Sequence, residues 1–342
     1  MGDHNLCDTK ESKPGMPGEV PDNVTVGVLE KKEFPTQSDL ALAELLTRFI
    51  EDSRENEPTS DELWADLKER LESQWPSLTY NFLGSRIKCI AAGVGVADWI
   101  DTHFSAFETQ SGADHEIIIA AARGMTGLFS NDGIARVIKT ASSLEVTKME
   151  FLGYIASRLK NHVLIHAAGV ATTSGGILFV GPSMSGKSTL ATQCYVHGCP
   201  VMGDDFIAIH KETGELFCFP KSISLRRKTV NYLRDTPAIQ RLIKETRISG
   251  VIDPRKMIGW PVRPQKVKTI FILKGFKESV VTNVVKQSEV LKHIYFQLVA
   301  PPREIIKSAR GVKKLISEVV AYEIWHGTPE ETARCVMSLS QR

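Results

Sequence analysis

The chain has 342 residues, of which 42% are hydrophobic, and a formal net charge of +2. This length can hold one large core or two domains of ordinary size, and the charge balance indicates no global attraction to nucleic acid or membrane. No run of about 18 apolar residues occurs, and the polar start lacks the apolar core of a secretory signal. The six scattered cysteines match no standard zinc spacing. A cytoplasmic protein is expected, because unpaired thiols suit a reducing compartment.

The first half of the chain predicts a tail followed by a small α+β domain. Residues 1–36 are rich in Pro, Gly and charged residues, so a disordered tail is predicted there. Periodic apolar spacing then predicts the following elements: helices at 40–52 and 61–74, a hairpin at 78–93 that turns at Gly84-Ser85, a helix at 96–104, a buried strand at 115–122 and a helix at 144–159. The N-terminal domain is assigned to 37–145.

The second half predicts an α/β domain with a mixed sheet and considerable antiparallel character, assigned to 146–342. The predicted elements are a strand at 162–171, a buried strand at 177–181, a helix at 187–196, a strand at 200–210 broken near Gly203, a hairpin turn at 211–215, a hairpin of strands 268–276 and 279–285, and helices at 289–299, 303–321 and 328–338.

The segment "GPSMSGKS" (181–188) follows a buried strand, opens a helix and fits the pattern G-x-x-x-x-G-K-[ST]. Its glycines allow backbone N–H groups to surround phosphate oxygens, its lysine supplies a positive charge, and its last serine is placed for Mg²⁺. The start of the following helix also favours anions. We expect these residues to bind ATP: Gly181, Pro182, Ser183, Met184, Ser185, Gly186, Lys187, Ser188 and Thr189.

Two adjacent acids, Asp204 and Asp205, follow the apolar "PVMG". Adjacent side chains on a strand point to opposite faces, so one acid can reach Mg²⁺ while the other accepts a proton from a hydroxyl nucleophile. A solvated acidic loop is the alternative. The guanine motif N-K-x-D and the ABC signature L-S-G-G-Q do not occur, which argues against a Ras-like GTPase and an ABC ATPase.

The stretch "HAAGVATTSGGILFVGPSMSGKSTLATQCYVHGCPVMGDDFIAI" resembles the core of HPr kinase/phosphorylase. The following "FPKSISLR" is closer to HPr kinase-related kinases and most resembles the kinase B group. The resemblance covers 164–227. It implies the P-loop domain of the HPr kinase C-terminal type, with ATP and Mg²⁺ as cofactors and a homo-oligomeric state. It also implies catalytic roles for Lys187, Asp204, Asp205 and His166, with Ser188 and Asp205 near the metal. Without the resemblance, His166 would be interpreted as a core histidine.

The chain departs from the family pattern at two places. Thr189 stands where HPr kinase typically has Glu. The downstream signature R-G-x-G-[IV]-x-[DN]-[VI] is not intact, and residues 247–264 match it only loosely, at 250–253. These departures argue against HPr as the substrate and against the reverse, phosphorylase reaction.

Between Lys221 and Lys274 there are 14 Lys and Arg residues against three Asp and Glu. This basic segment fits a solvated surface, or a set of contacts to ATP or an acidic substrate for which Arg226 is a leading candidate. A nucleic-acid face is a weaker interpretation, because aromatic residues are not interleaved with the charges.

The predicted function is an ATP- and Mg²⁺-dependent kinase that phosphorylates a hydroxyl of a protein or peptide. A small-molecule kinase on the same scaffold and a nucleotide-dependent switch or nucleic-acid ATPase remain as alternatives. Neither a nucleic-acid nor a membrane partner is expected.

Overall fold

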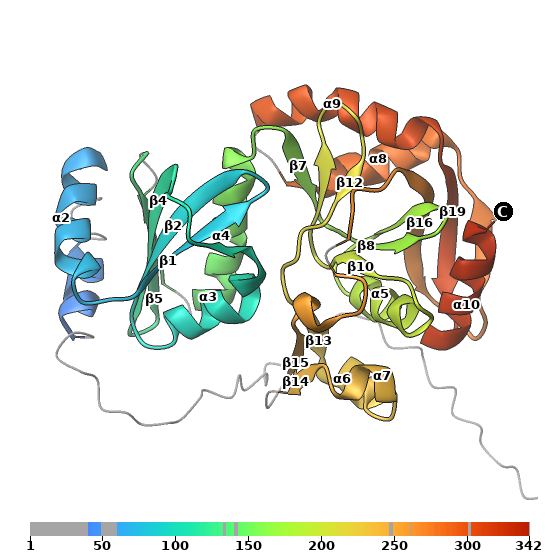
Figure 1. Cartoon of the computed structure of the whole chain (residues 1–342), viewed down its shortest axis with the longest axis horizontal. Helices are drawn as coiled ribbons and strands as arrows, with labels where there is room; N and C mark the ends of the chain where they lie inside the picture. Colours follow the sequence, from blue (N-terminus) through green and yellow to red (C-terminus); the bar gives the residue numbers. More distant parts are fainter. Residues whose placement is uncertain are drawn as a thin grey trace, which may run out of the picture. The chain divides into compact units, whose positions relative to one another are not determined.

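The computed structural model describes residues 40–48, 60–132, 135–139, 143–245, 249–260, 262–299 and 302–341. These residues form four sheets with helices packed on them, a mixed α/β fold (Figure 1). The tail predicted at 1–36 lies outside the described residues.

The first sheet has the strand order β3-β1-β2-β4-β5-β6. Its strands are β1 (Ser77–Phe82), β2 (Ser85–Ala92), β3 (Glu108–Thr109), β4 (His115–Ala122), β5 (Met125–Ser130) and β6 (Ala135–Lys139). In β4, Ile117 and Ile119 pack toward α3 (Val96–Phe104) and α4 (Ser143–Arg158). Ile118 packs toward α2 (Ser60–Glu72) and the helix at 40–48. Burial on both faces explains the apolar run at residues 117–122 of β4.

The second sheet has the strand order β10-β8-β9-β16-β19-β17 and carries the predicted phosphate loop. Its strands are β8 (Ala167–Thr172), β9 (Gly175–Val180), β10 (Val201–Gly203), β16 (Val267–Phe276), β17 (Val281–Val284) and β19 (Val320–His326). Strands β9, β16 and β19 are parallel, and β10 is antiparallel to β8, which is itself antiparallel to β9. The carboxyl ends of β9, β10, β16 and β19 therefore share one edge of the sheet.

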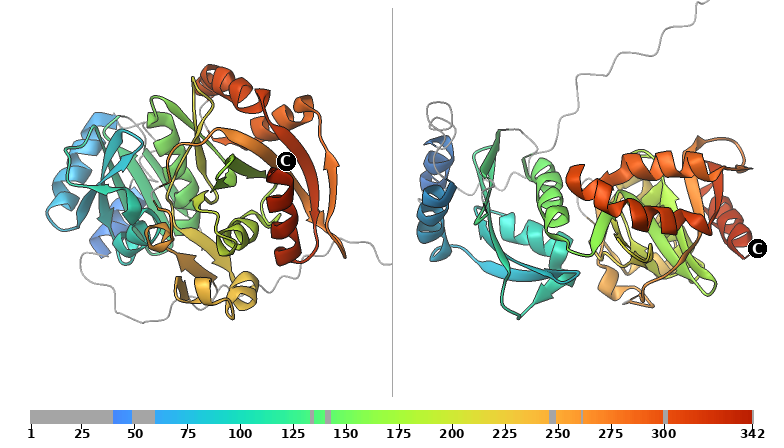
Figure 2. Two further views of the ribbon diagram at one scale, coloured as in Figure 1. Left: turned by 45° about the vertical axis from the view of Figure 1, so that its right-hand side comes forward. Right: turned by 90° about the horizontal axis from the view of Figure 1, so that it is seen from above.

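Helices cover both faces of this second sheet (Figures 1 and 2). Ile177 and Phe179 of β9 pack with α5 (Lys187–Val196) and α10 (Pro329–Ser340). Leu178 and Val180 pack on the opposite face with α8 (Gln287–Gln297) and α9 (Pro302–Ser317). The alternation along β9 thus fills both cores and holds the end of the strand rigidly.

Two smaller sheets complete the fold. The third sheet has the order β12-β11-β7-β18, with β7 (His162–Ile165), β11 (Ile207–His210), β12 (Leu216–Phe217) and β18 (Leu298–Val299). The fourth has the order β13-β15-β14, with β13 (Ile223–Arg226), β14 (Ile243–Glu245) and β15 (Ser249–Ile252). The remaining described elements are α6 (Arg227–Leu233), α7 (Pro237–Gln240) and 3₁₀ turns at Ser105–Phe107 and Pro254–Lys256.

Three sequence-based expectations were wrong. The single strand predicted at 162–171 is two strands in different sheets, β7 and β8, which separate at His166. The predicted hairpin of 268–276 with 279–285 does not form, because β19 lies between β16 and β17. The helix predicted at 303–321 ends at Ser317, and Val320 begins β19. The last two errors share one cause: β19 pairs in parallel with β16, a long-range contact that local periodicity does not encode.

Candidate active site

The predicted phosphate loop connects β9 to α5. Gly186 has a φ of 96° and caps α5, a backbone conformation that glycine adopts without strain. A Cβ built on Gly181 would lie 2.8 Å from Ser185 Oγ and 3.0 Å from the Leu273 carbonyl oxygen. Both glycines are therefore required by the backbone, one by its φ and the other by close packing. Pro182, Ser183 and Met184 are exposed.

Lys187 is folded back into this loop. Its side chain is buried, and its Nζ donates hydrogen bonds to the carbonyl oxygens of Gly181 at 2.9 Å and Pro182 at 3.0 Å. Burial lowers the pKa of Lys187, and the charges of Asp205 and Asp204 act in the opposite direction. The ammonium group thus lies within the loop, where a phosphate could replace the carbonyl oxygens as its partner.

Asp204 follows β10 and is fully buried. Burial, followed by the charge of Asp205, raises the pKa of Asp204 to about 6. The charge of Lys221, the Ser188 hydroxyl and the Asp205 backbone N–H act against this rise, yet neither carboxylate oxygen makes a hydrogen bond of normal geometry with a described residue. A buried carboxylate without hydrogen bonds of normal geometry costs folding free energy.

Asp205 is held in a different environment from its neighbour. Its φ is 61°, in the left-handed region. Its carboxylate lies 3.2 Å from the Nζ of Lys221 and 4.0 Å from the Nζ of Lys148. Burial acts to raise the pKa of Asp205, but these ammonium groups outweigh burial and lower it to about 2. Asp205 is therefore ionised at neutral pH.

His166 lies at the break between β7 and β8, beside the end of β9, since Ala167 pairs with Val180. Its Nδ1 is 3.0 Å from Gln297 Oε1, and its backbone N–H donates to the Gln297 carbonyl at 2.7 Å. Burial lowers the pKa of His166, and the charge of Lys187 adds to this effect. The ring is therefore neutral at pH 7 and close to both the loop and Asp205.

Two lysines of the site, Lys221 and Lys148, were not identified as site residues from the sequence. The Lys221 side chain is fully buried, and its Nζ also donates to the Ser222 carbonyl at 2.8 Å. Ser222 in turn donates its hydroxyl to the Thr102 carbonyl at 2.6 Å, which fixes this segment against α3. A lysine between the apolar "CFP" and "SISL" was an available signal for Lys221, whereas Lys148 on α4 had none.

Two of the predicted ATP-binding residues stand apart from these contacts. Arg226 is exposed at the end of β13, and no hydrogen bond or ion pair joins it to the loop within the described ranges. The Thr189 hydroxyl is 3.0 Å from that of Thr229 on α6. Asp204, Asp205, His166 and Lys187, in contrast, are brought together by the strand ends.

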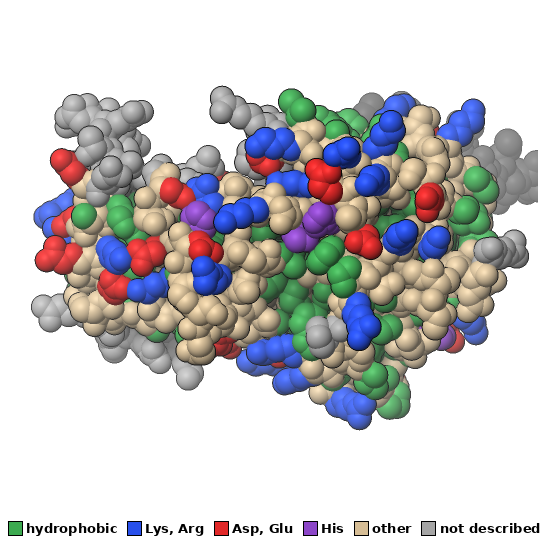
Figure 3. Space-filling model, turned by 45° about the horizontal axis from the view of Figure 1, so that its top comes forward, with side chains coloured by type: hydrophobic (Ala, Val, Ile, Leu, Met, Phe, Trp, Pro, Cys, Tyr) green, Lys and Arg blue, Asp and Glu red, His purple; other side chains and the backbone are tan. Residues whose placement is uncertain are grey.

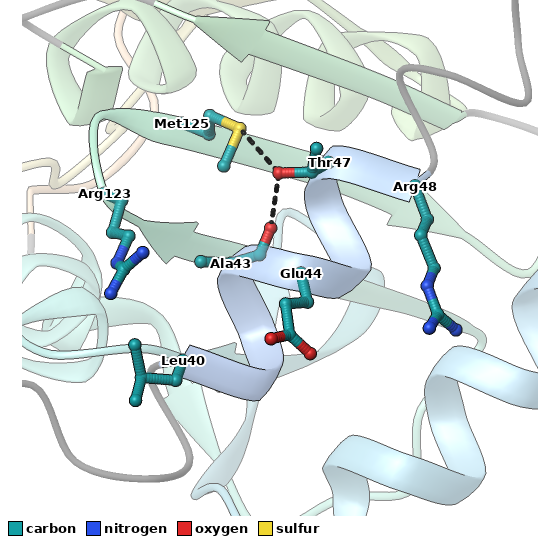
Figure 4. A pocket seen from close by; sticks show the side chains of 7 residues that line it. All are labelled: Leu40, Ala43, Glu44, Thr47, Arg48, Arg123 and Met125. Carbon is teal, nitrogen blue, oxygen red and sulfur yellow. Dashed lines mark hydrogen bonds between the residues drawn. The ribbon is translucent and has the colours of Figure 1, made fainter.

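A pocket of about 260 Å³ lies elsewhere, beside the helix at 40–48 (Figure 4). It is lined by Leu40, Ala43, Glu44, Thr47, Arg48, Arg123 and Met125. None of the residues predicted to bind ATP or act in catalysis lines it, so it does not belong to the candidate active site.

Several side chains of the basic segment have acidic partners. Arg227 and Arg234 both reach Glu245, at 2.8 and 3.3 Å, and Arg255 pairs with Asp253 at 2.7 Å. On the face drawn in Figure 3, basic and acidic side chains are interspersed. This distribution fits a solvated surface better than a continuous basic face.

Mg²⁺ is compatible with the residues present, although no cluster of three or more His, Cys, Asp or Glu that could hold a metal occurs among the described residues. A magnesium ion that binds together with phosphates takes only about one or two protein carboxylates. The Asp204 carboxylate beside the Ser188 hydroxyl meets that requirement. Within the described part of the chain, no helix has the length and apolar character needed to cross a membrane.

No family model matches the chain, and no curated protein matches it. Among solved structures, the Hpr(Ser) kinase/phosphatase from Coxiella burnetii is similar over 52% of this chain and 97% of its own, with 16% sequence identity and a TM-score of 0.26. A TM-score this low carries no argument about activity.

Proposed function

We propose that the chain is an ATP- and Mg²⁺-dependent phosphotransferase that phosphorylates a hydroxyl group of a protein or peptide. One observation carries the proposal. A buried carboxylate without a normal hydrogen bond, Asp204, lies beside Ser188 at the sheet edge where the loop holds Lys187. A glycine loop with an inward lysine serves phosphate binding, and the acid beside it serves the metal that accompanies phosphate.

The two aspartates have different surroundings, and these favour different roles. Ser188 and Asp204 would hold Mg²⁺, because the serine hydroxyl is near that carboxylate. Mg²⁺ at this position offsets negative charge on the phosphates. The sequence resemblance had placed Asp205 near the metal. In the proposal, Asp205 instead binds the acceptor hydroxyl, because this carboxylate is only half-buried and remains ionised.

Catalysis in this proposal is mainly positioning and charge stabilisation. Lys187 leaves the loop carbonyls and binds the transferred phosphoryl group. Asp205 accepts a hydrogen bond from the acceptor hydroxyl and takes its proton as the hydroxyl oxygen bonds to the γ-phosphorus, while the bond from that phosphorus to the β-phosphate oxygen breaks and ADP leaves. Lys221 and Lys148 hold Asp205 in place. The neutral His166 ring, fixed by Gln297, borders the same space.

The test is transfer of labelled phosphate from ATP. We expect the purified chain with Mg²⁺ to label a protein or peptide in a cell lysate, and Lys187→Ala or Asp204→Asn to lower kcat about 10²- to 10³-fold, as loss of one aligned electrostatic contact does. Lys228→Ala, an exposed lysine on α6, is the matched control and should retain full activity.

Three outcomes would contradict the proposal in different ways. Undiminished phosphate transfer by Lys187→Ala would show that the loop lysine takes no part in the reaction. Label confined to small molecules would identify a small-molecule kinase. ATP hydrolysis stimulated by RNA or DNA, with steep salt dependence and no transfer, would identify a nucleic-acid ATPase.

A further inference from the structure

An exposed aromatic ring lies at the sheet edge that carries the phosphate loop. Phe276 ends β16 and His326 ends β19, and the two residues are direct partners across these parallel strands. The Phe276 side chain is 67% exposed, whereas His326 is buried. A phenylalanine this exposed loses most of the stabilisation that burial would provide, so its position needs another explanation.

The Phe276 ring stacks on the His326 ring, with centroids 5.1 Å apart and an interplanar angle of 29°. This pair borders the loop directly. A Cβ built on Gly186 would lie 3.4 Å from His326 Nε2 and 3.7 Å from Phe276 Cζ. His326 Nε2 is buried without a hydrogen bond of normal geometry among the described residues, although the backbone of Ser185 is close enough to raise the pKa of the ring against the effect of burial. His326 therefore covers one face of the Phe276 ring.

The order of the strands places this pair opposite the acids. Starting from β9, which leads into the loop, β8 and β10 lie on one side, where β8 begins after His166 and β10 ends before Asp204. Strands β16 and β19 lie on the other side and end at Phe276 and His326. Ligands of α/β sheets bind at the carboxyl ends of parallel strands. With the reacting phosphate directed toward the acids, the nucleoside extends toward the aromatic pair.

We propose that Phe276, backed by His326, is the surface on which the base of the bound nucleotide stacks. This inference rests on the proposed function, since it concerns the same nucleotide. Stacking on an aromatic face depends on the area of the base and little on its hydrogen-bonding groups. The site should therefore bind ATP and GTP with similar affinity, and CTP and UTP more weakly because their bases are smaller.

The experiment is calorimetric titration of the full chain with Mg-ATP and, separately, with inorganic tripolyphosphate, which has the phosphates but no base. We expect Phe276→Ala to weaken ATP binding by about 5- to 150-fold, the range for loss of one aromatic–base stack. Binding of tripolyphosphate should change less than about twofold. Phe276→Tyr, which keeps the aromatic face, should retain ATP affinity.

Phe296→Ala is the matched control, because Phe296 is 82% exposed at the end of α8. This variant should bind both ligands like the unmodified chain. Unchanged ATP affinity in Phe276→Ala would overturn the stacking role even if the chain is a kinase. An equal loss for ATP and tripolyphosphate would also overturn it, since the variant would then have disturbed the loop. If the unmodified chain binds neither ligand, the proposed function itself fails.

Discussion

Lys221 is expected to stabilise the fold through Asp205, and a double-mutant cycle of Lys221→Met with Asp205→Asn measures this coupling. The Lys221 side chain is fully buried with its Nζ 3.2 Å from the carboxylate, and methionine keeps most of its volume without the charge. Removing one partner leaves the other charge inside the protein, so each single variant also reports a desolvation cost. The cycle isolates the pairwise contribution.

The magnitude follows from the pKa of Asp205, which is lowered from 3.8 to about 2. Such a shift corresponds to roughly 2 kcal/mol of folding free energy at pH 7. Lys148 is farther away, at 4.0 Å, and shares this stabilisation. We therefore expect a coupling of about 1 to 2 kcal/mol between Lys221 and Asp205. Because the folded-state pKa is below the unfolded-state value, the stabilisation is complete above about pH 5 and is lost as the pH falls toward 2.

Urea unfolding between pH 7 and pH 3 is the assay. A cycle with Lys228→Met, an exposed lysine, in place of Lys221→Met should show no coupling to Asp205. A coupling below about 0.3 kcal/mol at pH 7 for the Lys221 cycle, or one that does not shrink on acidification, would refute the ion pair as the force that holds Asp205.

Two further substitutions test the site. Asp204→Asn should stabilise the metal-free fold by roughly 2 to 3 kcal/mol at pH 8, because the Asp204 pKa is raised to about 6 and its ionisation opposes folding. As the pH rises from about 4 through 6, the free energy of unfolding of the wild-type chain should fall relative to that of the variant. Equal free energies of unfolding at pH 8, measured in urea, would count against a buried charge at Asp204. Gly186→Ala should destabilise the fold by about 1 to 3 kcal/mol, since its φ is 96°. Gly153→Ala in α4 is the control, because the φ of Gly153 is not positive and a Cβ there meets no atom within 4 Å. We expect this control to gain a little stability in thermal melting. A loss of stability as large as that of Gly186→Ala would refute the backbone argument.

Local patterns predicted many of the described elements, whereas β5, β6, β14, β15, α6 and α7 were not predicted. The helix expected at 96–104 is α3, the strand expected at 115–122 is β4, and the helix expected at 187–196 is α5, each with the predicted bounds. These segments carry their signal in the spacing of their own apolar residues. The errors at 162–171 and 303–321 concern segments whose structure depends on pairing with distant strands, as β19 depends on β16.

The candidate site divides in the same way. The sequence alone predicted the loop and the acid pair, because the spacing G-x-x-x-x-G-K-[ST] and two acids after an apolar stretch are visible in contiguous residues. Only the tertiary structure decided what surrounds them. Lys148 of α4 and Lys221 reach Asp205, and Phe276 reaches the other side of the loop at Gly186. These neighbours follow from strand order and helix packing, which long-range burial sets.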